Sequence, residues 1–318
     1  MNTPAYQPPF YQFNGHLQTI MPSLFRKVKN VHYERERIYT ADEDFLDLDW
    51  LRKGSSDTLL IVSHGLEGDS HRSYVKGMVR AFARRGCHAL AWNYRGCSGE
   101  PNLQERFYHS GATEDLEAVV QHVRQLGQYK KIILSGFSLG GNLTLKYLGE
   151  RGSNIAPELW KAAVFSVPLD LSGSSTQISQ RSNWIYNKRF LNHLGKKIKS
   201  KAAKMPGRLD VGALRDIKTL RQFDDTYTAP LHGFINAEAY YAHCSALRYL
   251  DNIQLPTLIL NAKNDPFLSD SCYPEASLKE HPFITFEAPE EGGHVGFAPA
   301  PGEELYYSEK QALEFVLG

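Results

Sequence analysis

Residues 130–150 read KKIILSGFSLGGNLTLKYLGE, and this stretch, in which a G-x-S-x-G pattern joins an apolar run to a helical one, decides the fold. A serine at the tip of a sharp strand-to-helix turn has a strained backbone, and side chains two residues away on either side would collide. Gly136 and Gly140 remove those collisions, and Gly141 lets the helix approach the strand closely. The helix N-terminus also directs amides and a positive dipole end toward Ser138. The pattern therefore predicts a nucleophilic serine rather than a turn in which a serine only caps the helix.

Short apolar runs alternate with helical patterns on both sides of this stretch. The runs have the length and composition of buried strands, and they are 58–63, 88–93, 131–135, 162–167, 257–261 and 283–288. Residues 74–85 and 113–126 carry apolar stripes at helical spacing. Because the runs are almost continuously apolar, they favour parallel strands covered on both faces. We therefore expect an α/β fold, a mostly parallel central sheet with helices on both faces.

Two regions depart from this alternation. Residues 38–49, IYTADEDFLDLD, predict a hairpin that is antiparallel at the edge of the sheet. Residues 170–250 contain several helical patterns and no clear strand. Within 181–221, twelve Lys or Arg stand against two Asp, a local net charge of +10. We expect one domain over 1–318, with 170–250 inserted as a helical cap, or lid, over the strand ends.

The composition excludes several classes of protein. Lys and Arg number 36 and Asp and Glu 35, so no overall charge favours a nucleic-acid partner. With 12% aromatic residues, the chain is not mainly disordered. No apolar run approaches the about eighteen residues of a spanning helix, and the first residues, MNTPAY, do not resemble a signal peptide. We expect a cytoplasmic protein that binds no nucleic acid.

The cysteines and histidines are scattered rather than clustered. The four cysteines contain no CxxC pair, and a disulfide framework is not expected in so long a chain. We expect four free thiols in a reducing compartment. The spacing of His, Cys and carboxylates also does not match a metal site, so we expect neither a metal nor a cofactor.

The predicted nucleophile needs a base, and the base needs an acid that holds it. Asp265 follows the run 257–261, at the carboxyl end of a strand, where open α/β sheets build their sites. Asp251 precedes that strand, and Asp270 lies farther into the following segment. We therefore favour Asp265 as the acid that acts with Ser138, over a solvated turn aspartate before a proline.

The base is expected in a loop after the last strand. Residues 283–288 supply that strand, and paired glycines then give His294 a flexible approach to the sheet edge. His294 is also the last histidine of the chain, whereas His281 precedes the strand and is interpreted as a surface residue. We expect His294 to take the proton from Ser138.

Acyl chemistry also needs two amides directed at the developing negative charge. One is the amide of Leu139, directly after the nucleophile. The other is expected in the loop after 58–63, where we assign the amide of Leu66. His64 in this loop is interpreted as a turn-shaping residue rather than a base. Ser98 follows another strand, but its surroundings lack the spacing of the G-x-S-x-G turn.

Eight blocks resemble the α/β-hydrolase superfamily, and more narrowly its YheT-like esterase branch, which is related to eukaryotic abhydrolase-domain lipid enzymes and yeast medium-chain ester synthases. The blocks are 14–20 (NGHLQTI), 44–50 (DFLDLDW), 64–68 (HGLEG), 93–96 (NYRG), 136–142 (GFSLGGN), 240–247 (YY and CSAL), 265–267 (DPF) and 293–297 (GHVGF). They span nearly the whole chain in family order. The resemblance implies that Ser138, Asp265 and His294 form the charge-relay triad and that the reaction is the hydrolysis of short- or medium-chain acyl esters.

Two enzymatic functions fit these residues. In a serine carboxylesterase, water releases the acyl group from Ser138 as the free acid. In an acyltransferase, or ester synthase, an alcohol accepts the acyl group from the same acyl-enzyme, and nothing in the sequence separates the two acceptors. His64 and Asp69 also fit an H-x-x-x-x-D spacing discussed for acyl transfer in the superfamily, but the oxyanion loop already explains the histidine.

A third function is that of a peripheral lipid-binding protein. An apolar stripe runs beside several lysines of the cap, as in basic helices that lie on anionic bilayers, and its residues are Trp184, Ile185, Leu191, Leu194 and Ile198. Such a stripe more often packs on the protein body with its lysines in water. Contact with an anionic membrane therefore stays the minor alternative.

The cap is also expected to line the acyl pocket. The aromatic candidates for contact with substrate are Trp184, Tyr186, Phe234 and Tyr240. Large aromatic side chains favour an apolar acyl group, so the expected partner is a small-molecule acyl ester. The natural substrate and the oligomeric state do not follow from the sequence.

Overall fold

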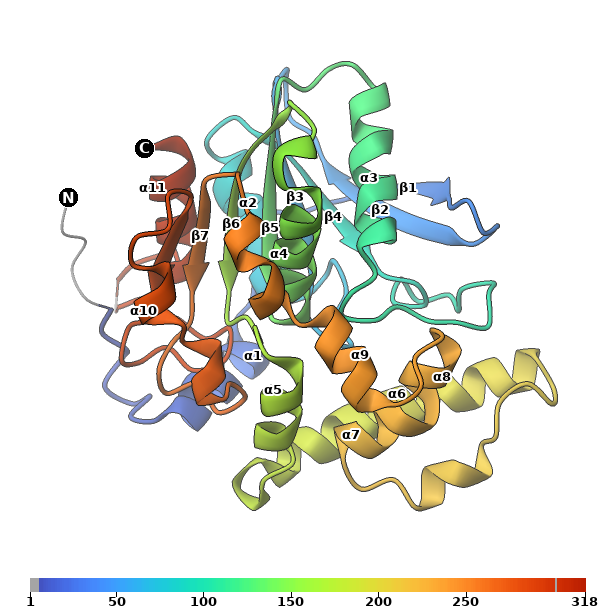
Figure 1. Cartoon of the computed structure of the whole chain (residues 1–318). Coiled ribbons are helices and arrows are strands. Elements are labelled where there is room, and N and C mark those ends of the chain that lie inside the picture. Colours follow the sequence, from blue (N-terminus) through green and yellow to red (C-terminus); the bar gives the residue numbers. More distant parts are fainter. Residues whose placement is uncertain (1–5, 301) are drawn as a thin grey trace.

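In the part of the chain that the computed structural model describes, residues 6–300 and 302–318, eight strands form one sheet (Figure 1). They are β1 (Glu34–Tyr39), β2 (Phe45–Leu51), β3 (Thr58–Ser63), β4 (His88–Asn93), β5 (Lys131–Phe137), β6 (Leu159–Phe165), β7 (Thr257–Leu260) and β8 (Ile284–Glu287). Their order is β1-β2-β4-β3-β5-β6-β7-β8. The hairpin β1–β2 and the pair β2–β4 are antiparallel, and the remaining pairs are parallel. This confirms the predicted α/β fold, with the hairpin at the sheet edge.

The predicted apolar runs all lie on strands, and β3 and β4 have the predicted bounds. The largest difference is at β6, which occupies Leu159–Phe165 rather than 162–167. The charged Lys161 interrupts the apolar pattern near the start of β6, so the predicted run begins only at residue 162. Trp160 and Lys161 are half-buried in the structure. The strand ends early because Ser166 has a positive φ of 52°, which turns the chain out of the sheet.

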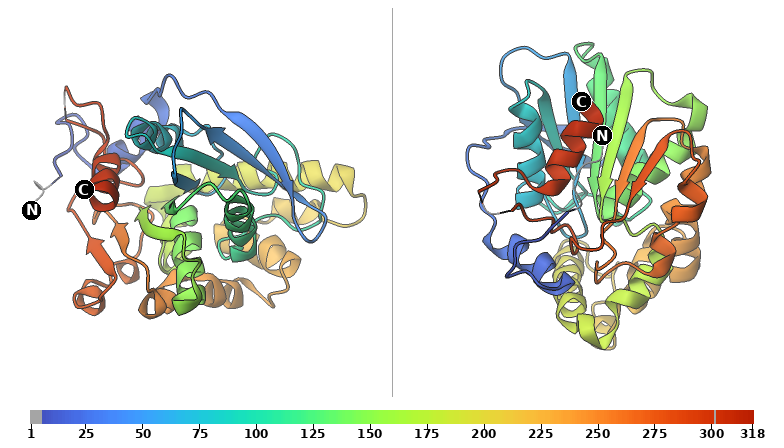
Figure 2. Two further views of the ribbon diagram at one scale, coloured as in Figure 1. Left: turned by 90° about the horizontal axis from the view of Figure 1, so that it is seen from above. Right: turned by 90° about the vertical axis from the view of Figure 1, so that its left-hand side faces the viewer.

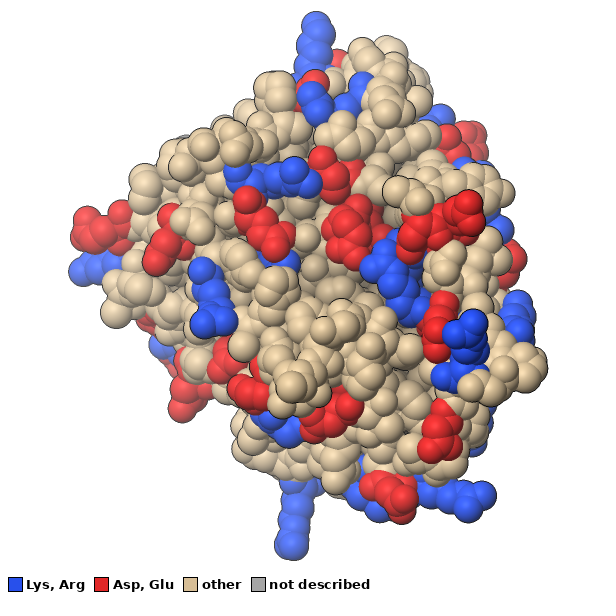
Figure 3. Space-filling model, turned by 45° about the vertical axis from the view of Figure 1, so that its right-hand side comes forward, with Lys and Arg blue, Asp and Glu red and all other residues tan. Residues whose placement is uncertain are grey.

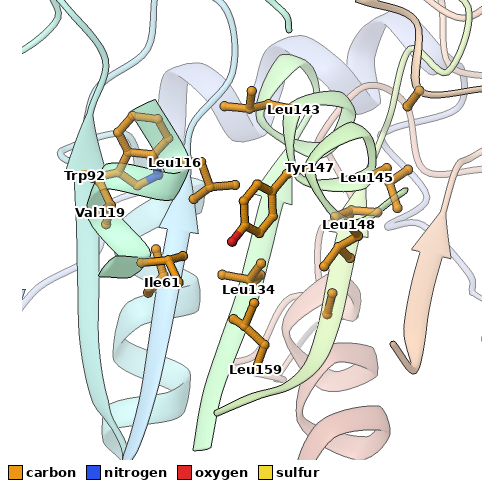
Figure 4. Packing of buried hydrophobic residues seen from close by; sticks show 14 of the residues in the cluster. Ile61, Trp92, Leu116, Val119, Leu134, Leu143, Leu145, Tyr147, Leu148 and Leu159 are labelled. Carbon is orange, nitrogen blue, oxygen red and sulfur yellow. The ribbon is translucent and has the colours of Figure 1, made fainter. Parts of the chain in front are cut away.

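Helices cover both faces of the sheet (Figures 1 and 2). On one face lie α2 (Ser73–Ala83) and α11 (Tyr307–Leu317), and on the other lie α3 (Thr113–Gln125) and α4 (Leu139–Arg151). Each face has its own hydrophobic core: the first lies under α2 and α11, and the second under α3 and α4. Because successive strand residues point to opposite faces, Leu60 belongs to the first core and Ile61 to the second. Figure 4 shows the second core, where Leu143 and Tyr147 of α4 pack over Ile61 and Leu134.

Between β6 and β7 the described chain contains helices and no strand. They are α5 (Leu171–Ile178), α6 (Trp184–Lys204), α7 (Leu220–Phe223), α8 (Ala229–Leu231) and α9 (Ala237–Cys244). We call residues 171–244 the helical insertion. It lies beside the carboxyl ends of the parallel strands, at the bottom of Figure 1. The remaining helices are α1 (Gly15–Phe25), which precedes the sheet, and α10 (Glu275–Leu278), which packs beside β8.

Three expectations about the whole chain can be compared with this structure. The four cysteines, all described, are free thiols. Among residues 6–300 and 302–318, no helix combines the length and apolar character needed to cross a bilayer. Five of the six residues tested for a signal peptide, Met1–Ala5, lie outside the described residues. Acidic and basic side chains are interspersed over the face in Figure 3, and their totals in the chain are nearly equal.

A buried ion cluster ties the sheet edge to the helical layer. Arg95, in the loop after β4, is 2% exposed. Its guanidinium donates to Asp42 and Asp44 of the β1–β2 turn, at 2.9 Å each, and in bidentate geometry to Asp115 of α3, at 2.7 and 2.8 Å. The planar fork of arginine suits such paired contacts, which lysine cannot reproduce.

We expect Arg95→Met to lower the free energy of unfolding by about 3–5 kcal/mol, because it leaves buried carboxylates without their cation. Urea denaturation at pH 7 measures this change. The matched control is Arg85→Met, at an exposed arginine after α2, for which the change should stay within about 0.5 kcal/mol. A similar small effect at Arg95 would contradict the structural role given to the cluster.

Candidate active site

Ser138 occupies the sharp turn between β5 and α4. Its backbone has φ 53° and ψ −121°, a conformation that side-chain-bearing residues rarely adopt. The surrounding backbone holds it there: the Ser138 N–H donates to the carbonyl of Phe165 at 2.9 Å, and its own carbonyl accepts from Gly141 and Asn142. The strain is therefore fixed by hydrogen bonds to a neighbouring strand and to the following helix.

The two glycines of the G-x-S-x-G pattern allow this turn, as the sequence predicts. A Cβ on Gly136 would lie 2.3 Å from the carbonyl oxygen of Gly140. A Cβ on Gly140 would lie 2.4 Å from the carbonyl oxygen of Ser63 in β3. Both obstacles are backbone atoms, so neither can move aside without displacing the turn.

The structure brings together the three residues expected to act on the acyl group. Nε2 of His294 lies 2.9 Å from Oγ of Ser138, and Nδ1 lies 2.8 Å from Oδ2 of Asp265. Asp265 is buried, and its other oxygen accepts the N–H of Phe267 at 2.9 Å. Asp251 and Asp270, the weaker candidates, are exposed. The arrangement can pass a proton from the serine to an imidazole that the carboxylate orients.

Three polar side chains to which the sequence analysis gave no role position the loop of His294. The backbone N–H of His294 donates to Oγ1 of Thr19, and that of Gly293 donates to Oδ1 of Asn264, both at 2.9 Å. The side chain of Asn264 donates in turn to Gln18. Gln18 and Thr19 belong to the N-terminal block of the family resemblance, and that block was their only signal.

His64 is buried, and both of its ring nitrogens are occupied. Nδ1 lies 2.8 Å from the carbonyl oxygen of Gly65, and Nε2 accepts the backbone N–H of Tyr94 at 3.3 Å. Burial lowers the pKa of His64 to about 3, so the ring is neutral near pH 7. The residue shapes the turn, as interpreted from sequence. Since no ring nitrogen is free, its spacing to Asp69 does not create a second catalytic base.

The two amides expected to bind an oxyanion border the same space as Ser138. Leu139 is the first residue of α4, where N–H groups have no partner within the helix. Among the described residues, the N–H groups of Leu66 and Leu139 form no hydrogen bond. In contrast, the amides on either side of Leu66 donate to buried tyrosine hydroxyls at 3.0 and 2.8 Å. These flanking bonds hold the loop while the Leu66 amide stays available.

An ion pair connects the helical insertion to this loop. Nζ of Lys197, on α6, lies 2.7 Å from Oε1 of Glu67, and both side chains are mostly buried. Glu67 has a positive φ of 53°, and the same carboxylate accepts the hydroxyl of Tyr108 at 2.8 Å. Helix α6 therefore contacts the residue next to Leu66 directly.

Two cavities meet at Ser138 and His294. Cavity A, of about 120 Å³, extends into the helical insertion, where its walls include Ile178, Phe190, Leu194, Leu220, Phe223, Asp224 and Tyr241. Cavity B, of about 360 Å³, lies between α1, the loop 65–68 and the start of α6. A substrate bound at Ser138 thus has two separate spaces for its two halves.

The four aromatic residues expected to contact substrate separate into two groups. Tyr240 lines cavity A, and Tyr186 lines cavity B. Trp184 lines neither cavity, since it begins α6 and is 58% exposed. Phe234 also lines neither, because it packs on the far side of Tyr240 and beside His243. The structure therefore does not place Trp184 or Phe234 in the wall of either cavity, and only Tyr186 and Tyr240 stay candidates for contact with substrate.

The apolar stripe of α6 is divided in a similar way. Ile198 is buried, and Leu191 and Leu194 are half-buried against the rest of the insertion. Trp184 and Ile185, at the start of the helix, are 58% and 53% exposed. Most of the stripe therefore packs on the protein body, and only its first turn faces solvent.

Comparison with known proteins agrees with this geometry. Residues 58–301 match the family model described as alpha/beta hydrolase fold. The YheT protein of Escherichia coli (strain K12), an esterase by designation, is 35% identical over 289 residues, which cover 89% of this chain and 84% of that protein. Phospholipase ABHD3 of Mus musculus is 32% identical over 305 residues, covering 93% and 74%. The solved structure of the Pyrococcus furiosus esterase Pf2001 shares the fold, with a TM-score of 0.59 and 17% identity over 92% of this chain and 95% of that one.

We expect Gly140→Ala to lower the free energy of unfolding by about 1–3 kcal/mol, because the new methyl group overlaps backbone atoms of β3. Thermal or urea unfolding measures the change. The matched control is Gly195→Ala in α6, where a Cβ would meet nothing closer than 3.8 Å. Alanine is the better helix former, so the control should gain about 0.5–1 kcal/mol. Equal effects at the two positions would show that the turn does not need its glycine.

Proposed function

Because the chain belongs to the α/β-hydrolase family, we propose that it is a serine carboxylesterase that hydrolyses short- or medium-chain acyl esters. The family supports a hydrolase of the esterase or lipase type. The observation that carries the finer proposal is the hydrogen-bonded chain from Asp265 through His294 to Ser138, with links of 2.8 and 2.9 Å. Such a chain activates a serine hydroxyl that is otherwise a poor nucleophile.

In the first half of the proposed reaction, Ser138 attacks the ester carbonyl. His294 takes the proton from Oγ as the new bond forms, while Asp265 holds the imidazole in the required tautomer and stabilises its charged form. His294 then gives that proton to the departing alkoxide, which leaves as the alcohol. The acyl group remains bonded to Ser138.

The tetrahedral intermediate carries negative charge on the former carbonyl oxygen. The free N–H groups of Leu66 and Leu139 are the proposed donors to it, and each can contribute on the order of 10²–10³ in rate. The N-terminus of α4 adds a positive dipole end beside the same oxygen. The residues that hold the loop of Leu66 therefore act on the rate indirectly.

In the second half, His294 activates the acceptor that removes the acyl group. Water gives the free acid and makes the protein an esterase. An alcohol bound in cavity B in place of water would make it an acyltransferase, and His294 lines that cavity. Hydrolysis is the proposed activity because water needs no binding site of its own.

We further propose that residues 1–318 form one domain in which the helical insertion serves as the cap of the site. Its residues supply most of the wall of cavity A, as a cap over an acyl pocket would. Contact with an anionic membrane stays a prediction, supported by exposed Trp184 and Ile185 near Lys188. The cytoplasmic location also stays a prediction.

We expect Ser138→Ala to reduce kcat/KM for p-nitrophenyl butyrate by about 10⁴–10⁶, since the covalent pathway is lost. The matched control is Ser98→Ala, at a serine that lines neither cavity, and this variant should keep wild-type activity. Circular dichroism verifies that both variants are folded. Hydrolysis by Ser138→Ala at the wild-type rate would refute the proposed nucleophile.

We expect short acyl chains to be preferred. Cavity A measures about 120 Å³, and a protein cavity of about 150 Å³ holds one benzene molecule. The value of kcat/KM for p-nitrophenyl esters should therefore be highest for chains of about four to six carbons. Leu220→Ala enlarges cavity A, which this residue lines without lining cavity B, and should move the optimum to longer chains. A palmitoyl ester as good as a butyryl ester would contradict cavity A as the acyl site.

A further inference from the structure

One wall of cavity A contains a carboxyl group that the proposed mechanism does not use. Asp224 begins a short π-helix, Asp224–Thr228, directly after α7. It lines cavity A together with Tyr241 and Thr228. The other walls are mostly apolar side chains. A carboxyl group in such surroundings is costly unless hydrogen bonds compensate it.

The protein supplies only part of that compensation. Oδ1 of Asp224 accepts the hydroxyl of Thr228 at 2.5 Å, and Oδ2 accepts the hydroxyl of Tyr241 at 2.7 Å. The Tyr241 oxygen also lies 3.0 Å from Oγ of Ser175, so hydroxyl groups from three elements converge here. A carboxylate has about four acceptor positions, so each oxygen keeps capacity for a further donor.

No cation within the described residues forms an ion pair with Asp224, although the charge of nearby Arg221 acts on it from a distance. The arginine on the preceding helix, Arg221, donates instead to Glu238 and to Ser172, at 2.7 Å each. Burial raises the pKa of Asp224 to about 6, and the residue, which borders cavity A, keeps part of its surface exposed. The position is thus suited to receive a hydrogen bond from a molecule in cavity A.

We propose that cavity A binds an acyl chain that carries a hydroxyl group, and that this hydroxyl donates to Asp224. The inference rests on the proposed function, in which cavity A holds the acyl half of the ester. A hydroxyl is favoured over an ammonium group because Lys197 lines the same cavity and would repel a second cation. A wholly apolar chain would displace solvent from the carboxyl group without giving it a further donor, which costs binding.

The test compares p-nitrophenyl hexanoate with the 3-hydroxy and 6-hydroxy forms of the same ester. We expect wild-type kcat/KM to be about 10- to 100-fold higher for at least one hydroxy ester, the range given by one additional hydrogen bond to a charged group. Asp224→Leu should reduce this ratio to one or below. Asp216→Asn, at an exposed aspartate of the same insertion, should keep the wild-type ratio. A ratio near one in wild type, or a ratio unchanged by Asp224→Leu, would overturn the inference.

A binding measurement separates this inference from the proposed function. In the Ser138→Ala background, methyl 6-hydroxyhexanoate or methyl 3-hydroxyhexanoate should raise Tm more than methyl hexanoate does, and Asp224→Leu should remove the difference. If the wild type hydrolyses no ester but this difference is present, the esterase proposal fails and the hydroxyl site stands. If the wild type hydrolyses esters without any preference for a hydroxyl group, the esterase proposal stands and the hydroxyl site fails. Should Asp224→Leu not fold, Asp224→Asn replaces it and should lower the ratio, because a neutral amide oxygen is a weaker acceptor than a carboxylate.

Discussion

A hydrogen bond of 2.9 Å joins Ser138, on a strained turn, to His294, on a loop 156 residues further along the chain. This distance depends on the positions of the Ser138 turn and of the His294 loop, which separate parts of the chain hold in place. The turn is fixed by β5, α4 and backbone bonds to β6, whereas the loop is fixed by Thr19 of α1 and by Asn264. Because β5, β7 and β8 are parallel, their carboxyl ends meet at one edge of the sheet, and that shared edge makes the distance possible.

The sheet and the G-x-S-x-G turn could be predicted because their causes are local. A buried parallel strand needs a nearly continuous apolar run, and a turn this sharp needs glycine at Gly136 and Gly140. Asp265 and His294 were predictable for a related reason, since each follows a predicted strand at its carboxyl end. Chain order and strand polarity then limit the candidates to very few residues.

Other parts of the site depend on contacts that no local pattern records. Thr19 meets the His294 loop across 275 residues, and Gln18 meets Asn264 across 246. In the helical insertion, aromatic residues occur on every side of short helices, and packing alone decides their direction. Tyr240 therefore borders cavity A, while Phe234, six residues earlier, lies behind it. Asp224 was missed for the same reason, because an aspartate in the polar stretch QFDDTYT (222–228) carries no sign that it lines a cavity.

The contact between Lys197 and Glu67 gives the helical insertion a second effect besides enclosing a cavity. Glu67 follows Leu66 directly, and its strained backbone is held from one side by α6 and from the other by Tyr108. Any movement that lifts α6 away from the strand ends must separate this ion pair, and the loop then loses one of the contacts that hold it. Such a movement would therefore also loosen the loop that carries Leu66, so the position of α6 and the placement of the proposed oxyanion donor are mechanically coupled.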